Sequence, residues 1–310
     1  MKYQIIIFTL FFQSIYSQNK SLDTINDFTI NICNYSEVEN KKPIELDWVD
    51  IDRESIKKLN KLYTKFNTLE DIQRVFPNFI SGEGNFANKT YDCGYNLKTS
   101  IHQDYGGYGS IYISALYFEN KILKIRFTID IDREIVFNYL KADIKFVVEC
   151  KNDKLTFDKI IESNVQEYIK KHGDLYLVEF NENSKKAEAL SYFNDVLHGS
   201  KLEEPYYILN GLDSPTFDYI RFFIVSKDFA SLKNLIYSPS PTARLLIANT
   251  ILYLNKNQNF EIDDKLNNRI NEIIKTDQKI KSGIISCWIN KFEYDFYDVN
   301  NNFENYLYTK

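Results

Sequence analysis

A histidine and a carboxylate stand two positions apart in the sequence, at His102 and Asp104, and a glycine-rich run follows them. Side chains two residues apart on an extended segment point to the same side, so this pair could bind a metal ion or share a proton. The run Gly106-Gly107-Tyr108-Gly109 would let a ligand approach the backbone closely. His102 and Asp104 are therefore the candidate catalytic residues, and a hydrolase with its site beside them is one hypothesis.

The position of the glycine-rich run also has an ordinary explanation. It lies between two segments with strand-like alternation, where a hairpin loop is expected. It matches neither the dinucleotide-binding glycine pattern nor a P-loop with its lysine. The sequence contains no G-x-S-x-G motif, and none of its cysteines has the local context of a known nucleophile family. We expect no cofactor and no metal ion, and these absences favour a protein that is not an enzyme.

Acidic residues cluster at two places where helices are expected to begin. The run Asp130-Ile131-Asp132-Arg133-Glu134 lacks the glycine and the distant glutamate of an EF-hand loop. We predict a strand end followed by a helix start, where Asp132 caps the helix and Glu134 favours its positive end. Asp263-Asp264 predicts a second helix start of the same kind.

The remaining histidines and the cysteines give no clear site. His172 and His198 each precede a glycine, which is typical of a helix C-terminus. The four cysteines are too widely spaced for a C-x-x-C redox or zinc motif: Cys33, Cys93, Cys150 and Cys287. In an oxidising compartment a disulfide could form, and we favour Cys93 with Cys150 or Cys33. Buried free thiols are the alternative.

Composition and charge exclude some classes of function. The chain has 310 residues, 44% of them hydrophobic and 26% charged, which suits one large or two medium globular domains. Its formal net charge is -5, and it has no long run of lysine or arginine. A nucleic-acid partner is therefore not expected, because phosphate binding needs a basic surface.

The N-terminus has the order of features typical of a secretory signal peptide. Lys2 precedes the apolar run Ile5 to Phe12, and Ile15-Tyr16-Ser17 follows. We predict cleavage after Ser17, with a buried N-terminal strand as the alternative. The apolar run is shorter than the ~20 residues that span a bilayer, and no later stretch of the sequence is long enough, so the mature chain is not expected to span a membrane. The Ser-Gln ending resembles that of signal peptides in exported proteins of Bacteroidetes-type bacteria, which implies a periplasmic or secreted protein.

Residues 18–200 are predicted to form an α+β domain. Helical spacing covers 52–66 and 68–76, with Thr68 and Asp71 placed as a capping box. Strands are then predicted from alternation, at Thr90–Leu97, Ser110–Phe118, Lys121–Asp130, Ile144–Cys150 and Leu175–Phe180. The alternation in Lys121–Asp130 predicts one buried face and one face in water. We expect helices 68–76 and 133–139 to cover the buried face, and helices at 157–171 and 184–197 to follow.

A Thr-Leu-Glu-Asp-Ile helix start, a proline that ends the helix and three antiparallel strands occupy residues 68–130. This order resembles the small α+β modules of β-lactamase-inhibitor proteins and of outer-membrane-assembly lipoproteins. The resemblance implies an inhibitor or immunity-type binding role as one alternative, and no functional residue is transferred from it.

Residues 201–310 are predicted to be all-α. The stretch Leu232–Leu254 reads as a helix, a Ser-Pro-Ser-Pro corner and a second helix that is apolar nearly all round. This stretch resembles a HEAT-type helical repeat, in which Pro241, Arg244 and Ala248 match the usual corner proline, arginine and alanine. One clear unit and one degenerate neighbour imply a compact helical cap. We expect Leu245, Ala248 and Leu252 in its core, with Arg244 structural.

Taken together, these patterns predict an α+β domain followed by a HEAT-like helical domain, behind a signal peptide at 1–17. The leading hypothesis is an exported protein-interaction module that binds another protein or an envelope component. The alternatives are the hydrolase at His102 and Asp104 and the inhibitor or immunity-type protein.

Overall fold

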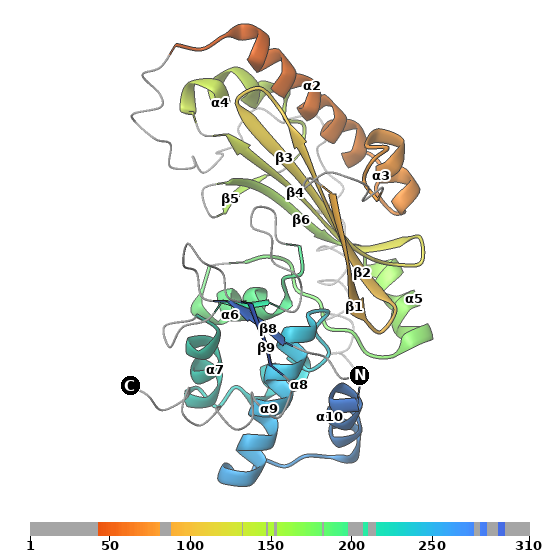
Figure 1. The fold of residues 1–310 in the computed structure, drawn as a ribbon, viewed down its shortest axis with the longest axis vertical. Helices are drawn as coiled ribbons and strands as arrows, with labels where there is room; N and C mark the ends of the chain where they lie inside the picture. The colour runs from red at the N-terminus through yellow and green to blue at the C-terminus, as the bar shows by residue number, and fades with distance from the viewer. Residues whose placement is uncertain are drawn as a thin grey trace, which may run out of the picture. The chain divides into compact units, whose positions relative to one another are not determined.

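The computed structural model describes ten ranges of the chain: 43–80, 88–131, 133–146, 148–151, 154–181, 183–197, 207–209, 215–275, 280–283 and 291–294. These residues form an α+β fold, as predicted, with an antiparallel sheet and helices packed on it (Figure 1). The predicted signal peptide at 1–17, the domain boundary near Lys201, Asp132 and His198 lie outside the described residues.

The main sheet has six antiparallel strands in the order β1-β2-β3-β4-β6-β5. Their bounds are β1 Asn88–Gly94, β2 Leu97–Tyr105, β3 Gly109–Phe118, β4 Lys121–Ile131, β5 Glu149–Lys151 and β6 Lys154–Ile160. The predictions for β3 and β4 are confirmed, and Glu119 takes a positive φ of 50° in the tight turn between them. The prediction of a strand at Ile144–Cys150 is wrong, because only the last two residues of this segment belong to β5.

The segment predicted as one strand, Thr90–Leu97, is a strand only over its first five residues, which belong to β1. The chain then reverses at Tyr95 and Asn96, and Leu97 begins β2. Gly94, Tyr95 and Asn96 all have positive φ, at 74°, 54° and 61°. Consecutive left-handed residues reverse the chain, and an aromatic residue is an uncommon choice there. As a result His102 and Asp104 lie inside a regular strand, β2.

Three helices lie with the first face of the sheet, which carries Phe127: α2 Leu46–Tyr63, α3 Leu69–Val75 and α4 Glu134–Leu140, followed by the short 3-10 helix η3 Lys141–Asp143. The capping box is confirmed, since Thr68 accepts from the N–H of Asp71 and the Asp71 carboxylate accepts from the N–H of Thr68. The helix expected from Asp52 begins six residues earlier, at Leu46. Phe127 packs edge-on against Phe66 and Phe146 in the apolar layer beneath these helices.

The second face of the sheet was expected to meet water, and this expectation is wrong for β4. Lys124, Arg126 and Thr128 are all buried there. Residues 174–181 and 195–197 cross over Lys124 and Arg126. Residues 175–180, predicted as a strand, have no regular secondary structure. The helix predicted at 157–171 begins later, as α5 Glu162–His172, because its first residues belong to β6.

The C-terminal half carries helices and a small second sheet. Its helices are α6 Lys185–Asn194, α7 Pro215–Val225, α8 Phe229–Leu235, α9 Pro241–Gln258 and α10 Asp264–Lys275. Strands β7 Tyr207–Leu209, β8 Ile280–Gly283 and β9 Lys291–Tyr294 form the second sheet. An all-α description of 201–310 is therefore wrong, because the apolar spacing after Ile280 includes two short strands. Helix α6, which precedes the expected boundary, contributes Ala189 and Phe193 to the helical core.

Helix α9 is the centre of that core. Ser240 caps it, Pro241 occupies its first turn, and Leu245 and Ala248 are buried as predicted, whereas Leu252 is only partly buried. Arg244 is fully buried beside the corner, where it donates to the carbonyl oxygens of Ser238 and Pro239 at 2.8 and 2.9 Å. Its expected structural role is therefore confirmed.

The described cysteines differ from the predicted pairing. Cys93 is a free, buried thiol, so the disulfide expected at this residue is wrong. Burial raises the pKa of its thiol to about 12, which makes it inert as a nucleophile. Cys150 is disulfide-bonded.

Candidate functional site

His102 and Asp104 lie on the face of β2 that α2 and α3 cover, so the prediction that they share one side of a strand is confirmed. His102 is 9% exposed, and its ring lies 5.5 Å from that of Phe76 and 6.4 Å from that of Phe79. Burial lowers the pKa of His102, and nearby Asp104 opposes that shift. The histidine is therefore held in an aromatic environment that disfavours its charged form.

Asp104 takes its partners from α2. Its Oδ2 accepts a hydrogen bond from Ser55 Oγ at 3.2 Å and another from Lys58 Nζ at 3.1 Å. In a serine-nucleophile triad the hydroxyl donates to the histidine, whereas here it donates to the carboxylate. These contacts of Asp104 attach α2 to the sheet, so its role is structural.

The glycine-rich loop between β2 and β3 binds a carboxylate of the chain itself. Asp52 of α2 accepts hydrogen bonds from the N–H groups of Gly107, Tyr108 and Gly109 at 2.8, 2.9 and 3.1 Å. A Cβ on Gly106 would lie 1.8 Å from Asp52 Oδ1, and one on Gly107 would lie 2.0 Å from the carbonyl oxygen of Trp48. The loop prediction is confirmed. The glycines allow α2, and not an external ligand, to approach the backbone of this loop closely.

The other charged candidates have structural partners. Asp130 is the last residue but one of β4 and forms an ion pair with Lys154 at 2.5 Å, and Glu134 opens α4. Asp263 accepts from the N–H of Leu266 and so caps α10, as predicted. His172 ends α5 before Gly173, also as predicted. Within the described ranges no group of three or more His, Cys, Asp or Glu residues is arranged to hold a metal ion.

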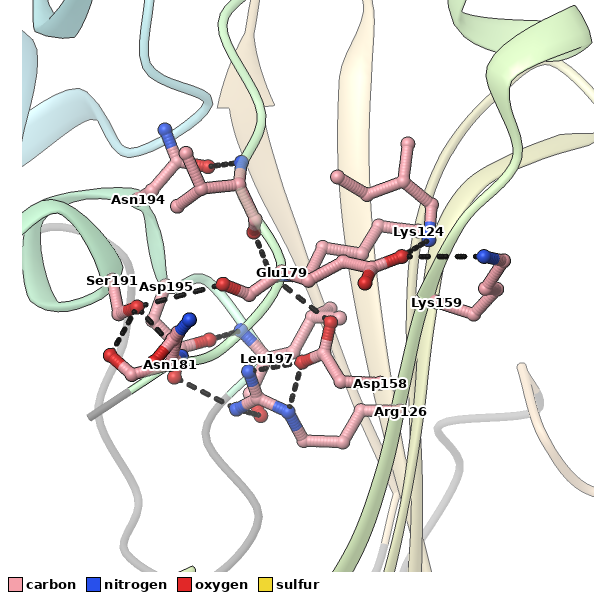
Figure 2. A network of polar contacts seen from close by, with 12 residues as sticks. Lys124, Arg126, Asp158, Lys159, Glu179, Asn181, Ser191, Asn194, Asp195 and Leu197 are labelled. Carbon is pink, nitrogen blue, oxygen red and sulfur yellow. Dashed lines mark hydrogen bonds and ion pairs between the residues drawn. The ribbon is translucent and has the colours of Figure 1, made fainter. Parts of the chain in front are cut away.

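A buried network of charges joins the second face of the sheet to the chain that crosses it (Figure 2). Arg126 and Asp158 stand directly opposite each other on β4 and β6, and Arg126 Nε donates to Asp158 Oδ2 at 2.7 Å. Arg126 Nη1 also donates to Asp195 Oδ2 at 2.7 Å and to the carbonyl oxygen of Leu197 at 3.0 Å. Lys124 Nζ donates to the carbonyl oxygen of Val178 at 2.7 Å.

This network is balanced, with two cations and two carboxylates. Lys124 Nζ lies 3.4 Å from Asp158 Oδ1, and both side chains are 2% exposed. Burial lowers the pKa of Lys124, whereas for Arg126 the opposite effect of Asp195 and Asp158 outweighs burial and raises the pKa. All four charged side chains are buried. A substrate would have no direct access to them. The contacts of the network hold residues 174–181 and 195–197 on the sheet.

The surface feature that stands out is apolar. Of the seven exposed large hydrophobic side chains among the described residues, six lie on α2, on α4 or at the end of β2. We call these six residues the α2–α4 patch: Leu46, Trp48, Ile51, Tyr105, Ile135 and Tyr139. Figure 1 shows the start of α2, the β2–β3 loop and α4 at the same end of the sheet.

Tyr108 joins the parts of this patch. Its ring lies 5.7 Å from that of Trp48, and the Arg133 guanidinium stacks over it at 4.6 Å. Its hydroxyl accepts a hydrogen bond from the N–H of Glu45 at 2.7 Å. One tyrosine in the β2–β3 loop therefore contacts both the first turn of α2 and the residue that precedes α4.

The supports of the patch are buried or paired. Asp52 holds the β2–β3 loop against α2, as described above, and Arg53 Nε donates to Asp143 Oδ2 of η3 at 2.9 Å. Asn60 of α2 donates to the carbonyl oxygen of Asp143 at 2.7 Å and accepts from the N–H of Lys145 at 2.9 Å. The apolar side chains of the patch thus project from elements that polar contacts fix in place.

The sequence pattern did not single out the patch, because the helix was expected to start at Asp52, after Leu46, Trp48 and Ile51. A usable signal was present, since large apolar residues alternate with acids in Glu45-Leu46-Asp47-Trp48. Comparisons of the chain with protein-family models, with curated proteins and with solved structures find no match.

Proposed function

We propose that this protein is an exported interaction module that binds a partner protein through the α2–α4 patch. The observation that carries the proposal is that six exposed large hydrophobic side chains belong to α2, α4 and the end of β2, elements that meet at one end of the sheet (Figure 1). Single exposed apolar residues are ordinary on protein surfaces, whereas a cluster of them is typical of an interface. Trp48 and the two tyrosines belong to the residue types enriched in binding hot spots.

The elements that carry the patch are held in place by polar contacts, and this order favours a role in binding. Asp52, Arg53 and Asn60 hold α2 to the β2–β3 loop and to η3 through contacts of 2.7 to 3.1 Å. An interface whose elements are already ordered loses less conformational entropy when a partner binds.

Site-specific photocrosslinking in the cells that produce the protein tests this proposal. A photoreactive phenylalanine analogue would replace Tyr105 or Ile135 in the patch, and Val225 as the control. Val225 is 77% exposed and lies on α7, away from the patch elements. We expect one discrete crosslinked product from the patch positions, weakened by Trp48→Ala. Equal products from Val225, or none from the patch, would contradict the proposal.

Export rests on the N-terminal pattern at 1–17, and the disulfide at Cys150 supports it, because disulfides persist in oxidising compartments. No helix in the described ranges is long and apolar enough to cross a membrane. Fractionation with N-terminal sequencing of the mature protein tests this part, with Gln18 expected as the first residue. A cytoplasmic chain that retains Met1 would overturn it.

We also infer that α8 and α9 form a single HEAT-like unit within the helical core. The contact between the two helices, the proline corner at Pro241 and the buried Arg244 support this inference. The apolar faces of this unit pack in the core of the chain. It is therefore proposed as a scaffold and not as the binding surface. Structural superposition of an experimental structure on HEAT repeats would decide the point.

A further inference from the structure

The exposed residues that lie between the apolar members of the patch on α2 are acidic, whereas Val49 between them is buried. The segment Pro43–Ile51 contains three acids and no lysine or arginine. Glu45, Asp47 and Asp50 are all exposed, as is Glu54 one turn further along the helix. Glu45 and Asp47 have no ion-pair partner among the residues that the structure describes, whereas Asp50 pairs with Arg53 and Glu54 with Lys57.

The helix dipole explains only part of this arrangement. Acids in the first turn favour the positive end of a helix, which accounts for Asp47. The effect fades beyond the first turn, so it does not account for Glu54, and it gives no reason for acids to alternate with exposed Trp48 and Ile51. Lysines occupy the other half of α2, so the apolar side chains lie at its acidic half.

Because acidic and apolar side chains alternate on this surface, we propose that the partner presents a positively charged amphipathic segment to the α2–α4 patch. Its apolar side chains would pack on Trp48 and Ile51, and its lysine or arginine side chains would lie near Asp47, Asp50 and Glu54. Electrostatic complementarity of this kind gives orientation and a faster association rate, while the apolar contacts supply most of the affinity. This inference rests on the proposed function and names the chemistry of the partner.

Fluorescence anisotropy with labelled synthetic peptides tests the inference on the full mature chain. The first peptide is an amphipathic helix of about 14 residues, or four turns, with lysine and arginine on its polar face. The second carries glutamate at each basic position, and the third keeps the charges but has serine in place of the apolar residues. We expect the basic amphipathic peptide to bind at least about tenfold more tightly than either of the others at low salt, and less tightly at high salt.

Two variants assign the binding to the patch. Asp47→Asn/Asp50→Asn/Glu54→Gln should weaken binding of the basic peptide about tenfold, and Trp48→Ala should weaken it by a similar factor or more. The matched control is Glu70→Gln/Glu162→Gln/Asp264→Asn, which also removes three exposed acids, each from the first turn of another helix. This control should leave binding unchanged. Equal loss in both triple variants would overturn the inference.

Two other occupants of the patch give distinct results. In Trp288→Phe, Trp48 is the remaining tryptophan, and we expect acrylamide to quench its fluorescence freely. A shielded Trp48 would mean that another part of the chain covers the patch. Light scattering that shows a dimer, returned to a monomer by Trp48→Ala, would mean that a second copy does. Either result overturns the inference. Patch-specific photocrosslinks without preference for the basic peptide would overturn it and leave the proposed function standing.

Discussion

Arg244 Nη2 donates a hydrogen bond of 2.7 Å to the carbonyl oxygen of Cys93, which stands 151 positions earlier in the chain. The guanidinium also stacks on Tyr95 of the β1–β2 turn, at 4.7 Å from the ring centre, and Arg269 of α10 lies 3.9 Å from that same centre. The first hairpin of the sheet is therefore tied to the helical core through Arg244, which is fully buried, and through Arg269. We expect the two halves to unfold together.

Replacing Arg244 with alanine should destabilise the protein by about 3–5 kcal/mol. The change leaves the carbonyl oxygens of Ser238, Pro239 and Cys93 without their donor and opens a cavity beneath Tyr95. Urea unfolding followed by circular dichroism measures the loss. Arg221→Ala is the control, because Arg221 pairs with Asp218 at the surface of α7, and it should cost less than about 1 kcal/mol. A similar small loss for Arg244→Ala would contradict its anchoring role.

Replacing Arg126 with methionine should cost about 3–5 kcal/mol, because Asp158 and Asp195 then remain buried without their main counter-charge. The matched control is Lys159→Met on the same sheet. Lys159 is 55% exposed and pairs with Glu179 only at 3.6 Å, so its loss should cost at most about 1 kcal/mol. Limited proteolysis gives an independent measurement. Cleavage should appear first between residues 174 and 197 in Arg126→Met, and cleavage elsewhere would speak against the network as the fastening of that segment.

The sequence predicted best those elements whose signals are local. The capping box at Thr68, the helix start at Asp263, the corner at Pro241 and the alternation in β3 and β4 each depend on residues within a few positions of one another. These features are all present. The hairpin turn at Gly94 to Asn96 was not found, because a tyrosine at positive φ is not a usual turn signal.

Features that depend on distant residues could not be read in the same way. Lys124, Arg126 and Thr128 have the alternation of a strand face in water, and only contacts with Asp158 and Asp195 reveal that the face is buried. These partners stand 32 and 69 positions from Arg126. The glycine-rich loop was predicted, but its carboxylate partner Asp52 comes from a helix 55 positions before Gly107.

The Asp52 carboxylate should be as important to stability as a core side chain. Asp52→Ala leaves the N–H groups of Gly107, Tyr108 and Gly109 without their acceptor, and we expect a loss of about 2–3 kcal/mol. Gly107→Ala should cause a comparable loss, because its Cβ would meet the carbonyl oxygen of Trp48. Thermal unfolding measures both.

The stability control for this loop is Asp50→Ala on the same helix, where the carboxylate is exposed and its pairing with Arg53 is worth little. This control applies to thermal unfolding alone, because Asp50 is one of the acids proposed to face the basic peptide. Both destabilising variants should also weaken binding of the basic peptide, since the β2–β3 loop carries Tyr108 of the interface. Full stability in Asp52→Ala would show that water replaces the carboxylate at the loop without cost.

His102 should make the stability of the protein depend on pH. Burial lowers its pKa from the ordinary value of 6.5, with Asp104 acting against that shift and Lys58 adding to it. Between pH 6.5 and the lowered pKa, His102 is therefore protonated in the unfolded chain and still neutral in the folded chain. The free energy of unfolding falls as the pH falls from 6.5 to the lowered pKa, by at most about 1.4 kcal/mol per pH unit for one proton. His102→Gln should remove this component in urea-unfolding curves taken from about pH 5 to about pH 8.

Asp104→Asn is the companion variant for this measurement. Without the carboxylate that raises it, the pKa of His102 should fall further, so the loss of stability should continue to lower pH than in the unmodified protein. Parallel profiles for the unmodified chain and His102→Gln would contradict the buried, neutral state of the ring. That state explains why the histidine packs against Phe76 and Phe79, since the aromatic rings stabilise an uncharged imidazole and offer no counter-charge to a protonated one.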